Sequence, residues 1–342
     1  MPLLRLLRSA VLTLGFILLS GCAATPSAPK RIGIIGLDTS HVVAFTTVFN
    51  KGPKNPADAA KFAGFRVTAA FAQGSKDIPE STVHVPDYTA KLEAMGVKVY
   101  DSIEKLCADV DFVMLESNDG RVHLEQVLPV FKSGKPVFID KPIAGSLADV
   151  IRIQEAAKKA GAVYFCSSSL RYAASTQAVA QGSIGKVKSA IATSPASLEP
   201  HHPDLYWYGV HGCESLYTVM GTGCLSVKRD KTPEGMIQVT GNWGNGRVGI
   251  FREADRKAKG GPYGGKAIGD KGEADIGKFD GYEVLLVSVV QMFRTGQAQV
   301  SPEETLELYT FMEAADESKR RGGAEVKLAD VLAKARSEVA GK

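Results

Sequence analysis

The residues best suited to chemistry are Asp140, Lys141 and Pro142, which follow a short apolar run at 137–139. A run of this kind is typical of a strand buried on both faces of a parallel sheet. Open α/β sheets bind ligands at the carboxyl ends of their strands, so we expect Lys141 to face a ligand. A lysine leaving a buried strand is partly desolvated and suits general acid or base catalysis. The Lys141–Pro142 bond can be cis. The alternative interpretation of these residues is a surface turn.

A second set of candidate residues lies later in the chain, where His211 and Glu214 fall within a predicted helix. Residues three positions apart share one face of a helix, so both side chains can point toward one site. Trp207 precedes them, and its flat apolar ring suits stacking on a sugar, as do Tyr206 and Tyr208. The alternative is a core histidine on an amphipathic helix.

The elements that position the first set alternate between strands and helices. The predicted strands are 31–35, 66–72, 98–100, 111–116, 136–140 and 162–168. The predicted helices between them are 42–49, 103–108, 122–133 and 147–160, the last ending at Gly161. This alternation predicts an α/β fold in which residues 31–172 form a Rossmann-type, doubly wound parallel sheet.

The pattern changes after residue 172. Helices are predicted at 176–181, 206–220, 281–295 and 302–320, with strands at 187–193, 236–242, 247–252, 263–269 and 272–275. Strands grouped together with helices to one side predict an α+β domain over 173–330, with an open and predominantly antiparallel sheet. Residues 331–342 are expected to be a C-terminal tail.

Asp140, Lys141 and Pro142 resemble the Glu-Lys-Pro signature of the glucose–fructose oxidoreductase, inositol dehydrogenase and rhizopine-catabolism family (Gfo/Idh/MocA). The resemblance covers residues 31–328. It implies an NAD- or NADP-dependent oxidoreductase that transfers hydride from a hydroxyl of a sugar, glycoside or cyclitol. It also implies a homo-oligomer formed through the open C-terminal sheet.

The resemblance also assigns roles to individual residues. Lys141 and His211 become acid/base groups, and His211 and Glu214 fit the second and third members of the family's Asp-x-x-x-His-x-x-Asp pattern. Trp207 stands where the first acid of that pattern belongs. Without that acid, proton transfer would depend more on Lys141 and His211. The remaining residues expected at the substrate, besides Trp207 and Glu214, are Arg171 and Tyr172. A structural ion pair is an equal alternative for Arg171.

The turn after the first strand should bind the phosphates of the dinucleotide through a Gly-x-Gly-x-x-Gly sequence. Gly36 keeps the first glycine, whereas Asp38 and His41 replace the second and third. Thr39 and Ser40 still offer hydroxyl and backbone donors at the start of a helix. The alternative is that this cluster only caps the helix.

The other expected cofactor residues follow later strands. Ser117, Asn118 and His123 resemble the family's Thr-Pro-Asn-x-x-His, with the histidine displaced by two positions, and Asp140 belongs to the same set. After the second strand no carboxylate is present to bind the adenine ribose, and Lys76 lies nearby, so NADP would be tolerated better than usual. Without the resemblance, His123 reads as an ordinary first-turn helix residue.

The N-terminus is typical of an export signal. Arg5 and Arg8 precede an apolar stretch too short for a comfortable membrane span, and Leu19-Ser20-Gly21-Cys22 fits the lipobox of bacterial lipoproteins. Residues 1–22 are therefore expected to be a lipoprotein signal with lipidated Cys22, and 23–30 a tether. The expected protein faces the periplasm from a lipid anchor, in the outer membrane rather than the inner. A signal anchor with a chance cysteine is the alternative.

Composition excludes some classes of function. The net charge of +4 gives no reason to propose nucleic acid as a partner. Cys107, Cys166, Cys213 and Cys224 form no CxxC pair and are expected to be buried free thiols. His201, His202 and Asp204 raise the alternative of a metal site, but adjacent histidines cannot easily share one ion, so no metal is expected.

Export conflicts with an exchangeable cofactor, because nicotinamide nucleotides are scarce outside the cytoplasm. We therefore expect NAD or NADP to be held tightly if the chain is an enzyme. The alternative function is a non-catalytic, membrane-tethered protein that binds sugars or serves as a scaffold. Asp38, His41 and the missing ribose carboxylate favour this alternative, whereas Lys141, Asn118 and His211 favour the enzyme.

Overall fold

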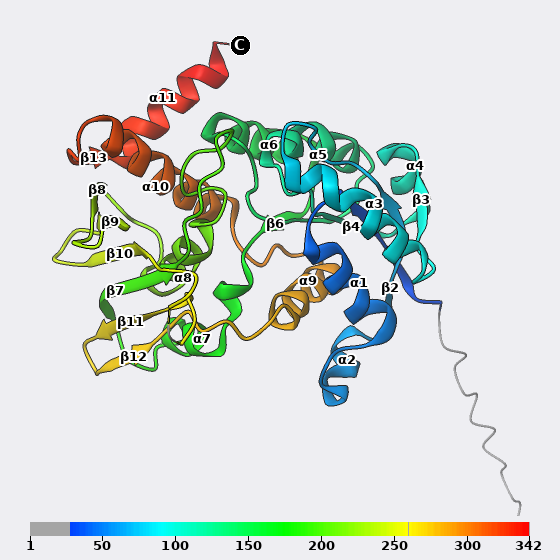
Figure 1. Cartoon of the computed structure of the whole chain (residues 1–342), viewed down its shortest axis with the longest axis horizontal. Coiled ribbons are helices and arrows are strands. Elements are labelled where there is room, and N and C mark those ends of the chain that lie inside the picture. The colour runs from blue at the N-terminus through cyan, green and yellow to red at the C-terminus, as the bar shows by residue number, and fades with distance from the viewer. Residues whose placement is uncertain (1–27, 259, 342) are drawn as a thin grey trace, which may run out of the picture.

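The computed structural model describes residues 28–258 and 260–341 (Figure 1). The expected signal peptide, Cys22 and most of the tether lie outside the described residues. Among the described helices none is both long and apolar enough to cross a bilayer.

The first sheet has six strands, all parallel, in the order β3-β2-β1-β4-β5-β6. Its strands are β1 (Lys30–Ile35), β2 (Phe65–Phe71), β3 (Lys98–Tyr100), β4 (Phe112–Leu115), β5 (Val137–Ile139) and β6 (Tyr164–Cys166). The order reverses between β1 and β4, which in open α/β sheets is where ligands bind. The predicted doubly wound sheet is confirmed.

Helices cover both faces of this sheet. They are α1 (Ser40–Lys51), α2 (Ala59–Phe62), α3 (Pro79–Glu93), α4 (Ile103–Asp109), α5 (His123–Lys132) and α6 (Leu147–Ala160), with 3₁₀ turns η1 (Pro56–Asp58), η2 (Gly120–Val122) and η3 (Ser169–Tyr172). Side chains alternate along each strand, so Ile34 of β1 packs with α1 while Ile35 packs with α4 to α6. The predicted cap at Gly161 adopts the left-handed conformation (φ 62°).

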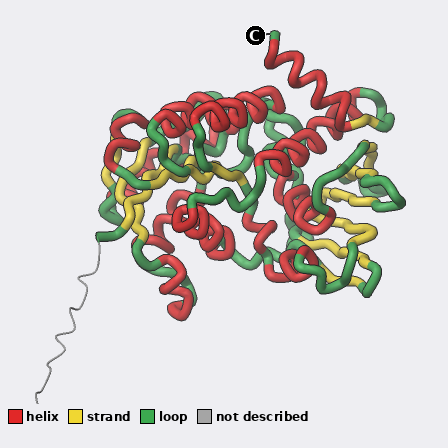
Figure 2. The backbone as a smooth tube through the Cα atoms, turned by 180° about the vertical axis from the view of Figure 1, so that it is seen from behind, coloured by secondary structure: helices red, strands yellow, loops and turns green. Residues whose placement is uncertain are grey.

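The second sheet has seven strands in the order β12-β11-β7-β10-β9-β8-β13. They are β7 (Val187–Ser194), β8 (Ser226–Lys231), β9 (Ile237–Asn242), β10 (Val248–Glu253), β11 (Gly264–Gly269), β12 (Glu273–Asp275) and β13 (Val326–Lys327). Only β7 and β10 pair in parallel, so the predicted, mainly antiparallel sheet is confirmed. Seen from behind, it lies at the edge of the molecule, with helices between it and the first sheet (Figure 2).

The remaining helices are α7 (Ala174–Ala180), α8 (Val210–Met220), α9 (Glu283–Thr295), α10 (Pro302–Arg320) and α11 (Leu328–Ala340). Helices α8 and α10 pack on the second sheet. Helix α9 instead returns to the first sheet, where Leu286 and Val289 join the same core as Ile32 and Phe138. The first sheet is therefore completed by a helix from late in the chain.

Sequence reasoning missed strands β8 and β13 and helices α2, α3 and α11. The segment expected to be a tail after residue 330 is helical over most of its described length, and α11 packs against α6 and α10 by burying Leu328, Val331 and Ala335. The four cysteines are buried and unpaired, as expected.

Candidate active site

A cleft of about 730 Å³ lies where the carboxyl edge of the first sheet meets the second domain. Among the residues singled out from the sequence, Thr39, Ser40, Asn118, Lys141, Trp207 and His211 line it, as do Asp38, His41 and Tyr208. These residues come from the turns after β1, β4 and β5 and from the region around the start of α8. The fold therefore brings both predicted sets to one place.

Lys141 leaves strand β5 and is almost buried (8% exposed), with its side chain at the cleft. Its Nζ lies 5.9 Å from the centroid of the Tyr208 ring, and no hydrogen-bond partner for it occurs among the described residues. The Lys141–Pro142 peptide bond is cis. An ammonium group without a partner at the wall of a cleft is available to a ligand.

Beneath Lys141, the carboxylate of Asp140 is bound by His41. The Nδ1 of His41 lies 2.5 Å from Oδ2 of Asp140, and the backbone N–H of Lys141 donates to Oδ1 (2.9 Å). Burial raises the pKa of Asp140, but His41 and Lys141 outweigh it, so the pKa lies below its ordinary value. The sequence offered His41 only as a departure from glycine, whereas its ring links the first turn of α1 to the end of β5.

His211 is half-buried on α8, and its Nδ1 lies 2.7 Å from the hydroxyl of Ser168. The rings of Tyr208 and Tyr263 meet it edge to face at 5.3 and 6.0 Å. Burial, and then the positive charge of Lys141, hold the pKa of His211 well below its ordinary value. The imidazole is therefore neutral near pH 7. When Nδ1–H donates to Ser168, Nε2 is free to accept a proton.

Glu116 is a buried carboxyl that the sequence did not single out. It follows strand β4 and is fully buried, and neither of its carboxyl oxygens has a hydrogen-bond partner among the described residues. Burial, and then the nearby charge of Asp140, raise its pKa well above the ordinary value. Glu116 is therefore neutral, and Asp140 is the charged carboxylate beneath the site.

Arg171, Tyr172 and Glu214 do not line the cleft. Nε of Arg171 donates to Glu214 (2.6 Å), and its Nη1 pairs with Glu304 of α10 (2.7 Å), all within the interior. The structure therefore places these three residues away from the cleft, and the polar groups of Arg171 and Glu214 bind each other. The alternative of a structural ion pair describes Arg171, and the pair fixes η3 against α8.

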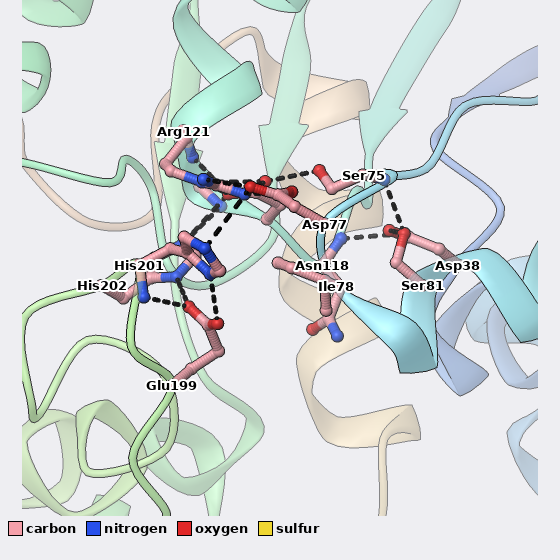
Figure 3. Close-up of polar contacts among 12 residues, drawn as sticks. Asp38, Ser75, Asp77, Ile78, Ser81, Asn118, Arg121, Glu199, His201 and His202 are labelled. Carbon is pink, nitrogen blue, oxygen red and sulfur yellow. Dashed lines mark hydrogen bonds and ion pairs between the residues drawn. The ribbon is translucent and has the colours of Figure 1, made fainter.

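The turn after β1 is shaped by close packing and by Asp38. Gly36 has a φ of 84°, and a Cβ there would lie 2.2 Å from Oγ of Ser117, so only glycine fits. Asp38 accepts hydrogen bonds from the hydroxyl of Ser81 (2.7 Å) and the backbone N–H of Asn118 (2.9 Å) (Figure 3). Its carboxylate is thus engaged by the protein, and burial raises its pKa.

The turns after β2 and β4 are joined directly (Figure 3). The hydroxyl of Ser75 donates to Asp119. The guanidinium of Arg121 donates to both carboxylate oxygens of Asp77, at 2.8 and 2.9 Å. Burial alone would raise the pKa of Asp119, but bonds from His202, Arg121 and Ser75 lower it well below its ordinary value. We call these contacts, together with Asp38–Ser81, the turn clasp.

The histidines considered for a metal belong to the edge of the clasp. Nδ1 of both His201 and His202 lies 2.7 Å from a carboxylate oxygen of Glu199, and Nε2 of His202 lies 3.1 Å from Oδ1 of Asp119 and 3.2 Å from the backbone nitrogen of Gly120 (Figure 3). Asp204 lies apart, paired with arginine and lysine side chains. Across residues 28–258 and 260–341, no group of three or more His, Cys, Asp or Glu side chains is arranged to hold an ion.

His123 and Ser117, expected at the cofactor, are interior. The ring nitrogens of His123 face the carbonyl oxygens of Ser117 (2.8 Å) and Ile143 (3.2 Å), and the hydroxyl of Ser117 donates to Gln126 (2.8 Å). Burial lowers the pKa of His123, so its neutral ring donates to one carbonyl only. Both residues shape the turn after β4 from within.

The cleft fits the nicotinamide and phosphate end of a dinucleotide. Thr39 and Ser40 place hydroxyls and a helix N-terminus on it, and Asn118 and Lys141 add donors. The adenosine end fits less well. Gln73 follows β2 where a carboxylate would bind the ribose, and its side-chain oxygen accepts from Gln126 (2.9 Å).

Comparisons with known proteins agree with this geometry. Residues 30–168 match the model of the Gfo/Idh/MocA family, described as an oxidoreductase family with an NAD-binding Rossmann fold. The chain is 34% identical over 109 residues to 1,5-anhydro-D-fructose reductase from Ensifer adhaerens, spanning 30% of this chain and 33% of that protein. It is 35% identical over 127 residues to myo-inositol 2-dehydrogenase from Thermotoga maritima, spanning 35% and 37%.

Each of these matches spans about a third of the relative. The fold extends further. The myo-inositol dehydrogenase of Lactobacillus casei, solved with NAD(H) and myo-inositol, superposes with a TM-score of 0.68 at 16% identity, covering 87% of this chain and 96% of that one. The N-terminal part of this chain is thus similar to the NAD-binding Rossmann domain of the Gfo/Idh/MocA oxidoreductases, and nearly the whole chain shares the fold of a solved dehydrogenase.

Proposed function

We propose that this chain is an NAD(P)-dependent oxidoreductase that acts on a hydroxyl of a sugar, glycoside or cyclitol in the cleft of Lys141 and His211. The observation that carries the proposal is the convergence of an unpartnered ammonium and a neutral imidazole on one cleft beside the start of α1. The family match and the names of the relatives support the same class of reaction.

The nicotinamide group would accept or supply the hydride, and the residues of this chain would manage the proton. In the oxidation direction, the substrate hydroxyl accepts from the ammonium of Lys141 and donates to Nε2 of the neutral His211, which takes the proton while Nδ1–H donates to Ser168. The ammonium of Lys141 stabilises the oxygen as it loses that proton. Asp140 and His41 hold Lys141 from below.

Replacing Lys141 with methionine should lower turnover about 10²- to 10⁴-fold, because the ammonium contacts the reacting oxygen. Nucleotide should still bind, since Thr39, Ser40 and Asn118 remain and methionine is only slightly shorter than lysine. Both are measured on the purified chain, by hydride transfer to NAD or NADP with inositols and hexoses and by calorimetry. Lys132→Met, an exposed lysine on α5, is the control. Unchanged turnover in Lys141→Met would refute the role of Lys141.

The pH profile of turnover should report on His211. Its folded-state pKa lies well below the ordinary 6.5, so the base stays neutral as the pH falls through 6.5. The acid limb of kcat should therefore appear only below pH 6.5, and His211→Gln should remove it along with most of the activity. A half-loss of kcat at or above pH 6.5 would contradict a neutral His211 as the base.

The turn clasp favours a second candidate function, a tethered sugar-binding protein without turnover. Asp38 fills the place of the glycine that normally lets the diphosphate approach, and the turns after β2 and β4 are bonded to each other. These contacts close the usual course of the adenosine half along the sheet edge. Direct measurement of nucleotide binding separates the two candidates.

The separating experiment uses Asp38→Gly. If the chain binds nucleotide at α1, removing the carboxylate beside the phosphates should tighten binding of NAD or NADP about tenfold or more. Asp87→Ala, which removes an exposed carboxylate of α3, should leave affinity unchanged. Affinities come from calorimetry, and acid-released nucleotide is quantified by mass. If neither the wild type nor Asp38→Gly binds nucleotide, the oxidoreductase is rejected and the binding protein is favoured.

We also propose that the mature chain is a lipoprotein, cleaved before Cys22 and anchored to the outer membrane with its folded part in the periplasm, and that copies associate through the open face of the second sheet. The sequence of the first 22 residues motivates the anchor. Cys22→Ala should move the chain from the membrane fraction to the soluble periplasmic extract. Retention of the variant in the membrane fraction would argue against lipidation.

A further inference from the structure

Two cations that line the active-site cleft lie near one aromatic ring, that of Tyr208. The guanidinium carbon of Arg256 lies 4.1 Å from the centroid of Tyr208, and Nζ of Lys141 lies 5.9 Å from it. Tyr208 itself meets His211 edge to face at 5.3 Å. Arg256, from the second domain, is therefore close to both acid/base residues, Lys141 and His211, through the ring of Tyr208.

Neither cation is neutralised by a direct carboxylate partner among the described residues. Arg256 donates from Nε (3.1 Å) and Nη2 (2.8 Å) to the hydroxyl of Ser197, and it also interacts with Tyr208. A guanidinium carries five N–H donors, so donors remain for a ligand. The ammonium of Lys141 has no hydrogen-bond partner among the residues that the structure describes.

The carboxylates near the cleft have other partners or none, and none forms an ion pair with Arg256 among the described residues. Asp38 lines the cleft, and its oxygens accept from Ser81 and Asn118. Asp140 lies next to Lys141 and faces His41. Glu80, exposed on α3, also lines the cleft. The guanidinium of Arg256 is therefore the cation at the cleft that is available to pair with an anion there.

We propose that the substrate is a sugar or cyclitol derivative that carries an anionic group, a carboxylate or a phosphate, and that Arg256 binds that group. The inference rests on the proposed function, since it places the sugar in the same cleft. A guanidinium matches the geometry of both anions with paired N–H donors. The ring faces of Trp207 and Tyr263, which also line the cleft, suit the apolar face of the sugar. Arg256 is thus a specificity-determining residue.

The test measures binding without nucleotide, so that its outcome is independent of turnover. The full chain is titrated with D-glucuronate, D-glucose 6-phosphate and neutral D-glucose, using the fluorescence of Trp207 at the cleft and calorimetry. One of the anionic sugars should bind about 10- to 100-fold more tightly than glucose, in keeping with a charge-assisted hydrogen bond. That preference should shrink as salt is raised. The better anion identifies carboxylate or phosphate as the group that is read.

Variants assign the preference to Arg256. Arg256→Gln should remove the 10- to 100-fold preference and leave glucose affinity unchanged, whereas Arg256→Lys should keep part of it because the charge remains without the planar fork. Arg321→Gln, an exposed arginine at the end of α10, should behave like the wild type. Because Arg256 is exposed, its replacement leaves the core intact.

Three outcomes would overturn the inference: glucose binding as tightly as both anionic sugars, an unchanged preference in Arg256→Gln, or no binding of any of the three probes. A loss in Arg256→Gln of nucleotide affinity alone would likewise assign Arg256 to the cofactor and reject it as a substrate residue. Preferential binding of an anionic sugar without any hydride transfer would sustain the inference and reject the oxidoreductase.

Discussion

The buried contact between His41 and Asp140 is the interaction on which the site depends. It joins the first turn of α1 to the end of β5, and it places an ionised carboxylate directly under Lys141. A buried charge of this kind is tolerated only when it is paired and hydrogen-bonded, and here an imidazole and a backbone N–H supply both. The ring of His41 is itself packed between Phe45 and Tyr282, so the pair is held rigidly.

The same arrangement explains how neighbouring groups differ in charge. Asp140 is ionised because its interactions with His41 and Lys141 outweigh its burial, whereas Glu116, on the neighbouring strand, has only burial and a like charge and stays neutral. His211 is neutral because desolvation and the positive charge of Lys141 both lower its pKa. Separated protonation states among close neighbours are characteristic of sites built for proton transfer.

Much of the fold was predictable because its signals are local. Apolar runs such as 137–139 and the glycine stop at Gly161 mark strands and helix ends directly, and Lys141 and His211 were found at the ends or faces of such elements. The pairing of Arg171 with Glu214 and of Asp38 with Ser81 was not predictable, because side chains far apart in sequence choose partners only in three dimensions. Arg256 was not predicted either, because its loop carries no periodic pattern that would mark it as part of a site.

Helix α9 bears on how the chain acquires its structure. It supplies Leu286, Val289 and Phe293 to a face of the first sheet whose strands all precede residue 167. During synthesis, that apolar face of the first sheet therefore stays uncovered until more than a hundred residues after β6 have been made. A chain of this design benefits from a chaperone that shields the half-finished sheet, and a domain cut off at residue 172 would not be a self-sufficient folding unit.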